Sequence, residues 1–201
     1  MAGQIYSITF KNKSTNWGNA CIYQTAPDLS PNMMSLAWIA KATHPTTDVV
    51  FEWTIDYGFS WSETGTLSPG VVFRASQSWP ADLENTNLVK LKYERETYTF
   101  GDQGRGPTSG TLYVQQAYNI PLKLSSIGIS MAGLPVFAEQ AQPNYTIMIT
   151  PKPKYWITFG NYTQGEVLDI TEITNTCEID LGGTIFNRTV ILNQDNTWTV
   201  E

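Results

Sequence analysis

The clearest pattern of hydrophobic and polar positions lies between Val49 and Trp61, where the sequence is VVFEWTIDYGFSW. Every second residue of this segment is apolar: Val49, Phe51, Trp53, Ile55, Tyr57, Phe59 and Trp61. Only an extended chain places such a set on one face, so the pattern predicts β-structure with all seven side chains facing a core. Because thirteen residues is long for one strand, we expect a bend near Asp56, Tyr57 and Gly58.

Further extended segments are separated by clusters of Gly, Pro, Asn, Asp and Ser. They cover residues 4–10, 20–24, 71–79, 88–93, 97–100, 111–116, 145–150, 155–159, 167–173, 184–190 continuing to 192, and 197–200. The last two are predicted to form a hairpin around Asn193 to Asn196, with its register fixed by Ile191 and Trp198. Short strands with this spacing are typical of a β-sandwich.

One segment has features of a helix. In SPNMMSLAWIAK, residues 30–41, Ser30 would be the N-cap and Pro31 the first helical residue, and the alternative is a loop that enters a strand at Leu36. No repeat, low-complexity tract or change in composition divides the 201 residues. We therefore predict an all-β fold, in which residues 1–201 form one two-sheet antiparallel β-sandwich domain with few or no helices.

The charge of the chain excludes some classes of partner. Charged residues make up 15% of the sequence and the formal net charge is -6. An acidic chain lacks the basic surface on which binding to nucleic acids or anionic membranes usually depends. The start MAGQIYSITFKNKS has no signal-peptide pattern, and no segment has about 18 consecutive apolar residues. We expect no transmembrane segment and a cytoplasmic location, with non-classical export left open.

Metal and thiol chemistry have little support. The chain has one histidine, His44, in the turn-like segment ATHPTT, and two distant cysteines, Cys21 and Cys177. These residues cannot form a zinc site of the usual His and Cys type, and we expect an exposed histidine and buried free thiols rather than one disulfide. The acidic residues Glu166, Asp169, Glu172, Glu178 and Asp180 do not match a calcium loop and are interpreted as a surface patch. No metal, cofactor or catalytic residue is predicted.

Two segments come closest to catalytic or phosphate-binding patterns. Glu52, Asp56 and Glu63 are the best set for a carboxylate-based hydrolase, but the solvated side of an amphipathic strand is the better explanation. The loop GDQGRGPTSG, residues 101–110, lacks the Gly-Lys-Ser/Thr ending of a phosphate loop and precedes a strand. It is predicted to connect two strands, and Arg105 is a candidate contact for an anionic partner.

Several aromatic residues lie outside the alternating segments and are candidates for exposure. They are Trp17, Trp79, Tyr155 and Trp156, and together with Arg105 they form our predicted ligand-binding set. Flat rings that stack on sugars would make the protein a lectin-like module. The chain also has only 12 Lys and Arg residues with which to protect strand edges, so self-association is a second expectation.

The segment MMSLAWIAKATHPTTDVVFEWTIDYGFSWSETGTLSPGVVFRASQSWPADL resembles the RhiA family, rhizosphere-induced proteins of plant-associated bacteria. The resemblance continues at YTFGDQGRGP, AEQAQPN, YWITFGNYTQGEVLDIT and LNQDNTWTV, so it covers nearly the whole chain. It implies an abundant accessory protein regulated by cell density, and it carries over no catalytic residues.

These observations lead to one principal hypothesis and three alternatives. The principal hypothesis is a non-catalytic accessory protein that acts in the interaction of bacteria with a host, by self-assembly into oligomers or polymers or by binding a surface. The first alternative is a lectin-like module that binds glycans, and the second is a β-rich toxin or pore-former. A carboxylate-based hydrolase is the last alternative.

Overall fold

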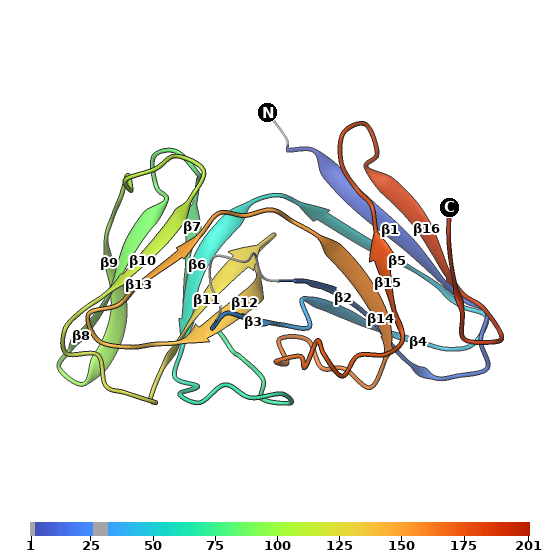
Figure 1. Cartoon of the computed structure of the whole chain (residues 1–201), viewed down its shortest axis with the longest axis horizontal. Coiled ribbons are helices and arrows are strands. Elements are labelled where there is room, and N and C mark those ends of the chain that lie inside the picture. Colours follow the sequence, from blue (N-terminus) through green and yellow to red (C-terminus); the bar gives the residue numbers. More distant parts are fainter. Residues whose placement is uncertain (1–2, 26–31) are drawn as a thin grey trace.

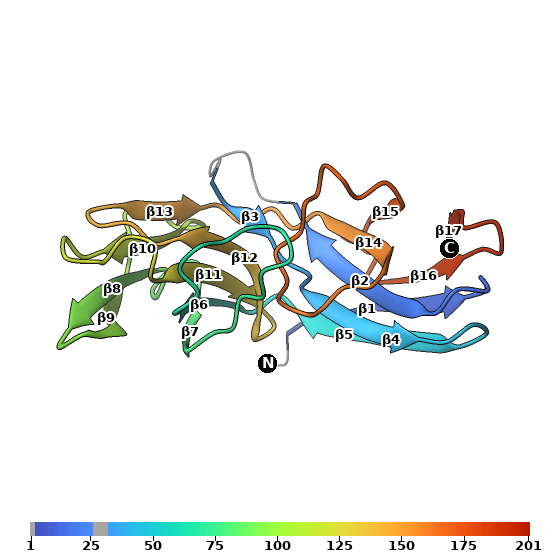
Figure 2. The ribbon, with the colours of Figure 1, turned by 90° about the horizontal axis from the view of Figure 1, so that it is seen from below.

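A computed structural model describes residues 3–25 and 32–201, and in this part the chain forms strands and no helix. The strands assemble into four sheets that stack in layers as two neighbouring lobes (Figures 1 and 2). The predicted all-β, sandwich-like class is therefore confirmed, although the sheets number four rather than two in the described part. That the whole chain is one domain stays a prediction.

The terminal lobe contains the two ends of the chain and lies on the right in Figure 1. One of its sheets has the order β17-β16-β1-β5 and the other has the order β15-β14-β2-β4. The strands are β1 (Ile5–Asn12), β2 (Gly18–Gln24), β4 (Ile39–Thr43), β5 (Asp48–Thr54), β14 (Tyr155–Gly160), β15 (Thr176–Ile179), β16 (Asn187–Leu192) and β17 (Trp198–Val200).

The central lobe is formed by the middle of the chain, together with the short strand β3. Its sheets have the orders β3-β12-β11-β6-β7 and β13-β10-β8-β9. The strands are β3 (Met34–Ser35), β6 (Tyr57–Ser62), β7 (Gln77–Ala81), β8 (Leu88–Glu94), β9 (Thr97–Gly104), β10 (Leu112–Gln116), β11 (Ser126–Met131), β12 (Leu134–Gln140) and β13 (Thr146–Ile149).

Not all strand pairs are antiparallel, which corrects the predicted topology. β1 lies parallel to β16, and β8 lies parallel to β10, whereas the other pairs of named strands are antiparallel. Parallel neighbours need a long connection, and here each connection passes through other strands before it returns. The C-terminal hairpin is as predicted: Asn193 to Asn196 form the turn, and Leu192 pairs with Trp198.

The alternating segment forms β5 and β6, which follow each other across the top of Figure 1 and belong to different lobes. Phe51, Trp53, Phe59 and Trp61 are buried, as predicted. The bend lies at Ile55 and Asp56, slightly earlier than expected. Ile55 is 38% exposed, so its predicted place in the core is wrong. At the bend the chain leaves one sheet for another, and the alternation of buried side chains is interrupted at Ile55.

An aromatic cluster of Trp38, Trp53 and Tyr155 packs at the junction between the lobes. The ring of Trp53 lies 5.3 Å from that of Trp38 and 5.1 Å from that of Tyr155, measured between ring centroids. Trp53 Nε1 donates to the Tyr155 hydroxyl at 3.3 Å, and Trp38 Nε1 donates to the carbonyl oxygen of Met131 in the central lobe at 3.0 Å. Both indole N–H groups are thus satisfied within one continuous hydrophobic core.

A second contact between the lobes involves two loops that the sequence pattern assigns to strands. Val167 N donates to Val71 O, and Phe73 N donates to Gly165 O. The two loops contribute side chains to a small hydrophobic core, which consists of Leu36, Leu67, Phe73, Ala138 and Val167. The predicted strands 71–79 and 167–173 are therefore wrong over most of their length, because their hydrophobic residues pack loop against loop.

The helix considered for residues 30–41 does not form in its described part. Met34 and Ser35 belong to β3, Leu36 makes an isolated bridge to Val167, and β4 begins at Ile39. Ser30 and Pro31 lie outside the described residues. The alternative of a loop that enters an extended segment is the one observed.

The two cysteines are free, as predicted. Cys21 on β2 is fully buried and Cys177 on β15 is half-buried, and β14 lies between the two strands. Strands two positions apart are separated by roughly 9.5 Å, which is more than the Cα separation of about 7 Å that a disulfide tolerates. Burial raises the pKa of the Cys21 thiol to about 12 and also raises the pKa of Cys177.

Truncation of a core ring tests the role of the alternating segment. Phe51→Ala removes a fully buried ring from β5 and should lower the free energy of unfolding by about 3–5 kcal/mol, measured by urea titration. The control Val50→Ala changes a side chain that is 46% exposed on the same strand and should cost less than about 1 kcal/mol. Equal losses in the two variants would contradict the assignment of the core face.

The cysteines should differ in reactivity. In the native protein at pH 8, iodoacetamide should modify Cys177 slowly and leave Cys21 untouched, because Cys21 is inaccessible and its raised pKa keeps it as the unreactive thiol. Increasing the pH should accelerate only the reaction of Cys177. Peptide mass spectrometry gives the sites, and Cys177→Ser should show no native labelling. Rapid labelling of Cys21 would show that β2 is not packed as described.

Candidate functional site

The five predicted ligand-binding residues do not come together in one site. Tyr155 is 2% exposed and lies in the junction cluster, so the expectation that its ring is exposed is wrong. Burial raises its pKa to about 12. Trp79 is half-buried against Phe100, Trp156 is half-buried beneath the Lys154 ammonium, and Arg105 is exposed on the loop after β9. Of these five residues, only Trp17 presents a large, freely accessible ring.

Trp17 is 73% exposed and lies on the loop between β1 and β2. Its ring contacts the imidazole of His44 at 4.2 Å between centroids, with an interplanar angle of 62°. His44 is itself exposed, as predicted, on the loop between β4 and β5. We call this pair the aromatic platform. The sequence pattern identified Trp17 but not its partner, because the contact joins two different loops.

Three loops meet at the end of the terminal lobe that carries the platform, on the lower right in Figure 1. The three loops are residues 13–17 between β1 and β2, residues 44–47 between β4 and β5, and the turn 193–196 between β16 and β17. Asn12, 1% exposed, holds the first loop: its Nδ2 donates to Asn16 O, and its Oδ1 accepts from Ser14. Asn16 Nδ2 donates to Asn196 Oδ1 at 2.7 Å, and Thr46 N donates to Asn12 O at 2.8 Å. Trp17 therefore projects from a region that is well connected by hydrogen bonds.

An open groove follows the bend between β5 and β6. A hollow of about 460 Å³ on one side is lined by Ile5, Glu52, Trp53, Thr54, Asp56, Ala132 and Gly133. An adjoining hollow of about 290 Å³ shares Asp56 and Gly133 and extends over Tyr57, Gly58, Ser78 and Ser130. Ala132 and Gly133, both at positive φ, form the two-residue turn between β11 and β12, and Ala132 N donates to Asp56 O at 2.9 Å.

The groove brings two of the predicted candidate carboxylates, Glu52 and Asp56, to one surface. Both are exposed to solvent, and Asp56 accepts a hydrogen bond from Thr54 Oγ1. A general acid of a glycosidase is normally a carboxyl group whose pKa is raised by an apolar environment, and an exposed carboxylate lacks that environment. The groove offers hydroxyl and carboxylate groups for hydrogen bonds, while Tyr57 has its pKa raised by burial and stays protonated.

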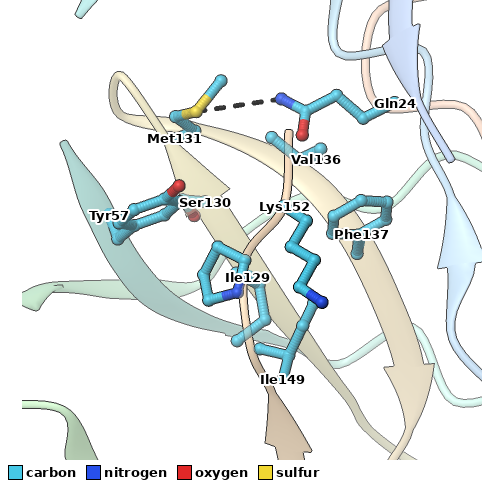
Figure 3. Close-up of a pocket in the computed structure, with 10 residues that line it drawn as sticks. Gln24, Tyr57, Ile129, Ser130, Met131, Val136, Phe137, Ile149 and Lys152 are labelled. Atoms are coloured by element: carbon cyan, nitrogen blue, oxygen red, sulfur yellow. Dashed lines mark hydrogen bonds between the residues drawn. The ribbon is translucent and has the colours of Figure 1, made fainter. Parts of the chain in front are cut away.

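A small crevice lies between the lobes, where Gln24 of the terminal lobe faces Met131 of the central lobe (Figure 3). Gln24 Nε2 lies 3.8 Å from Met131 Sδ, and the remaining wall is mostly apolar. Its volume is about 10 Å³, the size of a single water molecule, so it is a packing feature of the junction rather than a ligand pocket.

Residues 3–25 and 32–201 contain neither a cluster of metal-ligating side chains nor a membrane-spanning helix. No three His, Cys, Asp or Glu side chains in these ranges lie close enough together to hold a metal ion. The same residues include no helix with the length and apolar character needed to cross a membrane.

The edges of the sheets differ in how they are protected. Most edge strands carry a charge or a proline that discourages pairing: Asp48 and Glu52 on β5, Lys41 on β4, Glu178 on β15, Asp102 on β9 and Pro80 on β7. β3 and β17 have neither but are only two and three residues long. β13 has four residues, Thr-Ile-Met-Ile, without charge or proline, and Met148 is 53% exposed. It is the longest unprotected edge in the described part.

The comparisons with known proteins agree with the motifs in the sequence. The family model RhiA matches residues 3–201. Protein RhiA of Rhizobium leguminosarum bv. viciae is 34% identical over 207 residues, which cover 98% of this chain and 87% of that protein. No solved structure matches the chain. The match over almost the full length shows that this chain belongs to the RhiA family.

Proposed function

We propose that the protein is a non-catalytic accessory protein that acts through surface contacts, and that its principal contact is with a second copy of itself. The observation that carries this proposal is the edge strand β13, which has β10 on one side and no strand of the described residues on the other. Unpaired backbone groups on such an edge form hydrogen bonds readily with another strand.

Antiparallel pairing of two β13 strands about a two-fold axis suits this sequence. Centring the axis on Met148 places Met148 opposite its own copy, and Ile147 opposite Ile149 of the second copy. Ile147 and Ile149 are buried, whereas Thr146 and Met148 are exposed. The buried and exposed faces of one β13 strand would therefore continue into those of the second copy. A charged residue on the two-fold axis would oppose its own copy, and β13 contains no charged residue.

The chemistry available elsewhere favours contact over catalysis. Glu52 and Asp56 are exposed in the groove, and the raised pKa values of Cys21 and Cys177 disfavour nucleophilic thiolates. The exposed carboxylates count against a carboxylate-based hydrolase, and the raised thiol pKa values count against a cysteine nucleophile.

Charge introduced on β13 tests the proposal. Analytical ultracentrifugation of the wild type should show a mass that rises with concentration toward that of a dimer. Met148→Lys would place two ammonium groups opposite each other and should weaken association at least tenfold, equivalent to about 1.4 kcal/mol. The matched control Leu122→Lys changes a side chain that is 62% exposed in a loop and should behave as wild type.

The outcomes of this experiment separate clearly. A wild type that stays monomeric at every accessible concentration would refute self-association. Dimers that respond to Leu122→Lys but not to Met148→Lys would show that another surface pairs.

Glycan binding is a second candidate function, favoured by the exposure of Trp17 on a hydrogen-bonded loop. Tryptophan combines a large apolar ring with an N–H donor, which makes it a common residue at binding surfaces. This function does not depend on self-association, since it uses the other lobe.

A further inference from the structure

We infer that the aromatic platform, Trp17 with His44, is a carbohydrate-binding site for neutral saccharides. This inference deepens the second candidate function, on which it rests, by assigning the site, the ligand class and the role of each side chain. The indole of Trp17 would stack on the apolar face of a pyranose ring, and the imidazole of His44 would accept a hydrogen bond from a neighbouring hydroxyl.

The exposure of Trp17 is the first step of the argument. An indole is largely apolar, and leaving 73% of this residue in water forgoes stabilisation that burial would give. The other large ring near this end, Trp198, is half-buried against Phe10 in the core. Trp17 contributes little to the core and keeps both its surface and its Nε1 group available to a ligand.

Preorganisation is the second step. Binding by a mobile loop loses affinity because the loop must be ordered, whereas a fixed side chain avoids that cost. The loop of Trp17 is held by Asn12, Ser14 and Asn16, and the ring itself rests against His44. The loop of His44 is held in turn, because Thr47 Oγ1 donates to His44 O at 2.6 Å. Both members of the platform are thus positioned before a ligand arrives.

The hydrogen bond at His44 Nδ1 defines what the imidazole can do. Nδ1 lies 2.7 Å from the carbonyl oxygen of Pro45, which can only accept, so Nδ1 carries the hydrogen. In the neutral ring Nε2 is then an acceptor, suited to a sugar hydroxyl. The tautomer is set by the loop itself and needs no ligand.

The surrounding residues indicate the charge of the ligand. The three loops consist mainly of hydroxyl and amide residues: Ser14, Thr15, Asn16, Thr46, Thr47, Asn193, Gln194 and Asn196. The charged residues in these loops are Lys13 and Asp195, one of each sign. Hydroxyl and amide groups pair with sugar hydroxyls, and the mixed charge gives no preference for an acidic saccharide. Neutral saccharides are therefore the expected class.

The single histidine makes the site directly observable. His44 is the only histidine in the chain, so its Hε1 proton gives one resolved NMR signal that reports on the platform alone. We would titrate the protein with cellotetraose, xylotetraose and chitotetraose and measure binding in parallel by calorimetry. At least one saccharide should shift the His44 signal with the same dissociation constant that calorimetry gives.

Two variants distinguish the platform from other surfaces. Trp17→Ala should weaken binding at least tenfold and abolish the saccharide-induced shift of His44, and Trp17→Phe should retain part of both. Because Trp17 is exposed, neither variant should lose its fold, which circular dichroism checks. The matched control Tyr118→Ala removes a ring that is 78% exposed in the central lobe and should leave binding unchanged.

Failure of the site and failure of the function give different results. Calorimetric binding that persists in Trp17→Ala, with an unmoved His44 signal, would overturn the site while glycan binding stands. Absence of binding for all three saccharides would overturn both. Neither result bears on self-association through β13, which is measured without saccharide.

Discussion

Burial of Trp53 at the junction of the lobes is the constraint on which the rest of the structure depends. Its indole packs against Trp38 and Tyr155 and donates to the Tyr155 hydroxyl, while Trp38 donates to Met131 across the junction. Large aromatic rings dominate core energetics, and each indole N–H here is satisfied inside the protein. Only two residues further on, the chain turns at Ile55 and Asp56 and supplies Phe59 to the other lobe. The two lobes therefore share one core rather than being joined by a flexible linker.

The same strand also decides where the surface features lie. β5 pairs antiparallel with β1 from Ile5 opposite Thr54 to Lys11 opposite Asp48, and β1 pairs in parallel with β16 up to Asn12 opposite Leu192. The groove consequently lies at one end of this sheet, and the three connecting loops lie at the other. Eight residues of β1 separate the two ends by about 23 Å. Trp17 and His44, far apart in the chain, become neighbours because strand register brings their loops together.

Prediction from the sequence succeeded where the burial of a residue depends only on which face of its own strand it occupies. Alternation identified Phe51, Trp53, Phe59 and Trp61 because each is buried through its own strand, and the turn at Asn193 to Asn196 followed from local turn chemistry. Prediction from the sequence failed where burial depends on packing between segments that are far apart in the chain. Tyr155 was assigned to the surface because it lies outside the alternating segments, and β11 and β12 were missed because both of their faces are buried, which removes the alternation. The contact of Trp17 with His44 is equally non-local, so only half of the platform could be found in the sequence.

The low charge of the chain favours both proposed contacts. With few Lys and Arg residues, β13 is left without the charged side chain that most other edges carry, and the platform is surrounded by amides and hydroxyls instead of ions. β13 belongs to the central lobe, on the left in Figure 1, and the loop between β1 and β2 that carries Trp17 belongs to the terminal lobe, on the right. Pairing through β13 would therefore leave both platforms of a dimer accessible. Two weak sites on one rigid particle bind a repeating surface more tightly than either alone, because the second contact is formed at a high effective concentration. Association through one lobe and recognition through the other are thus compatible in a single particle.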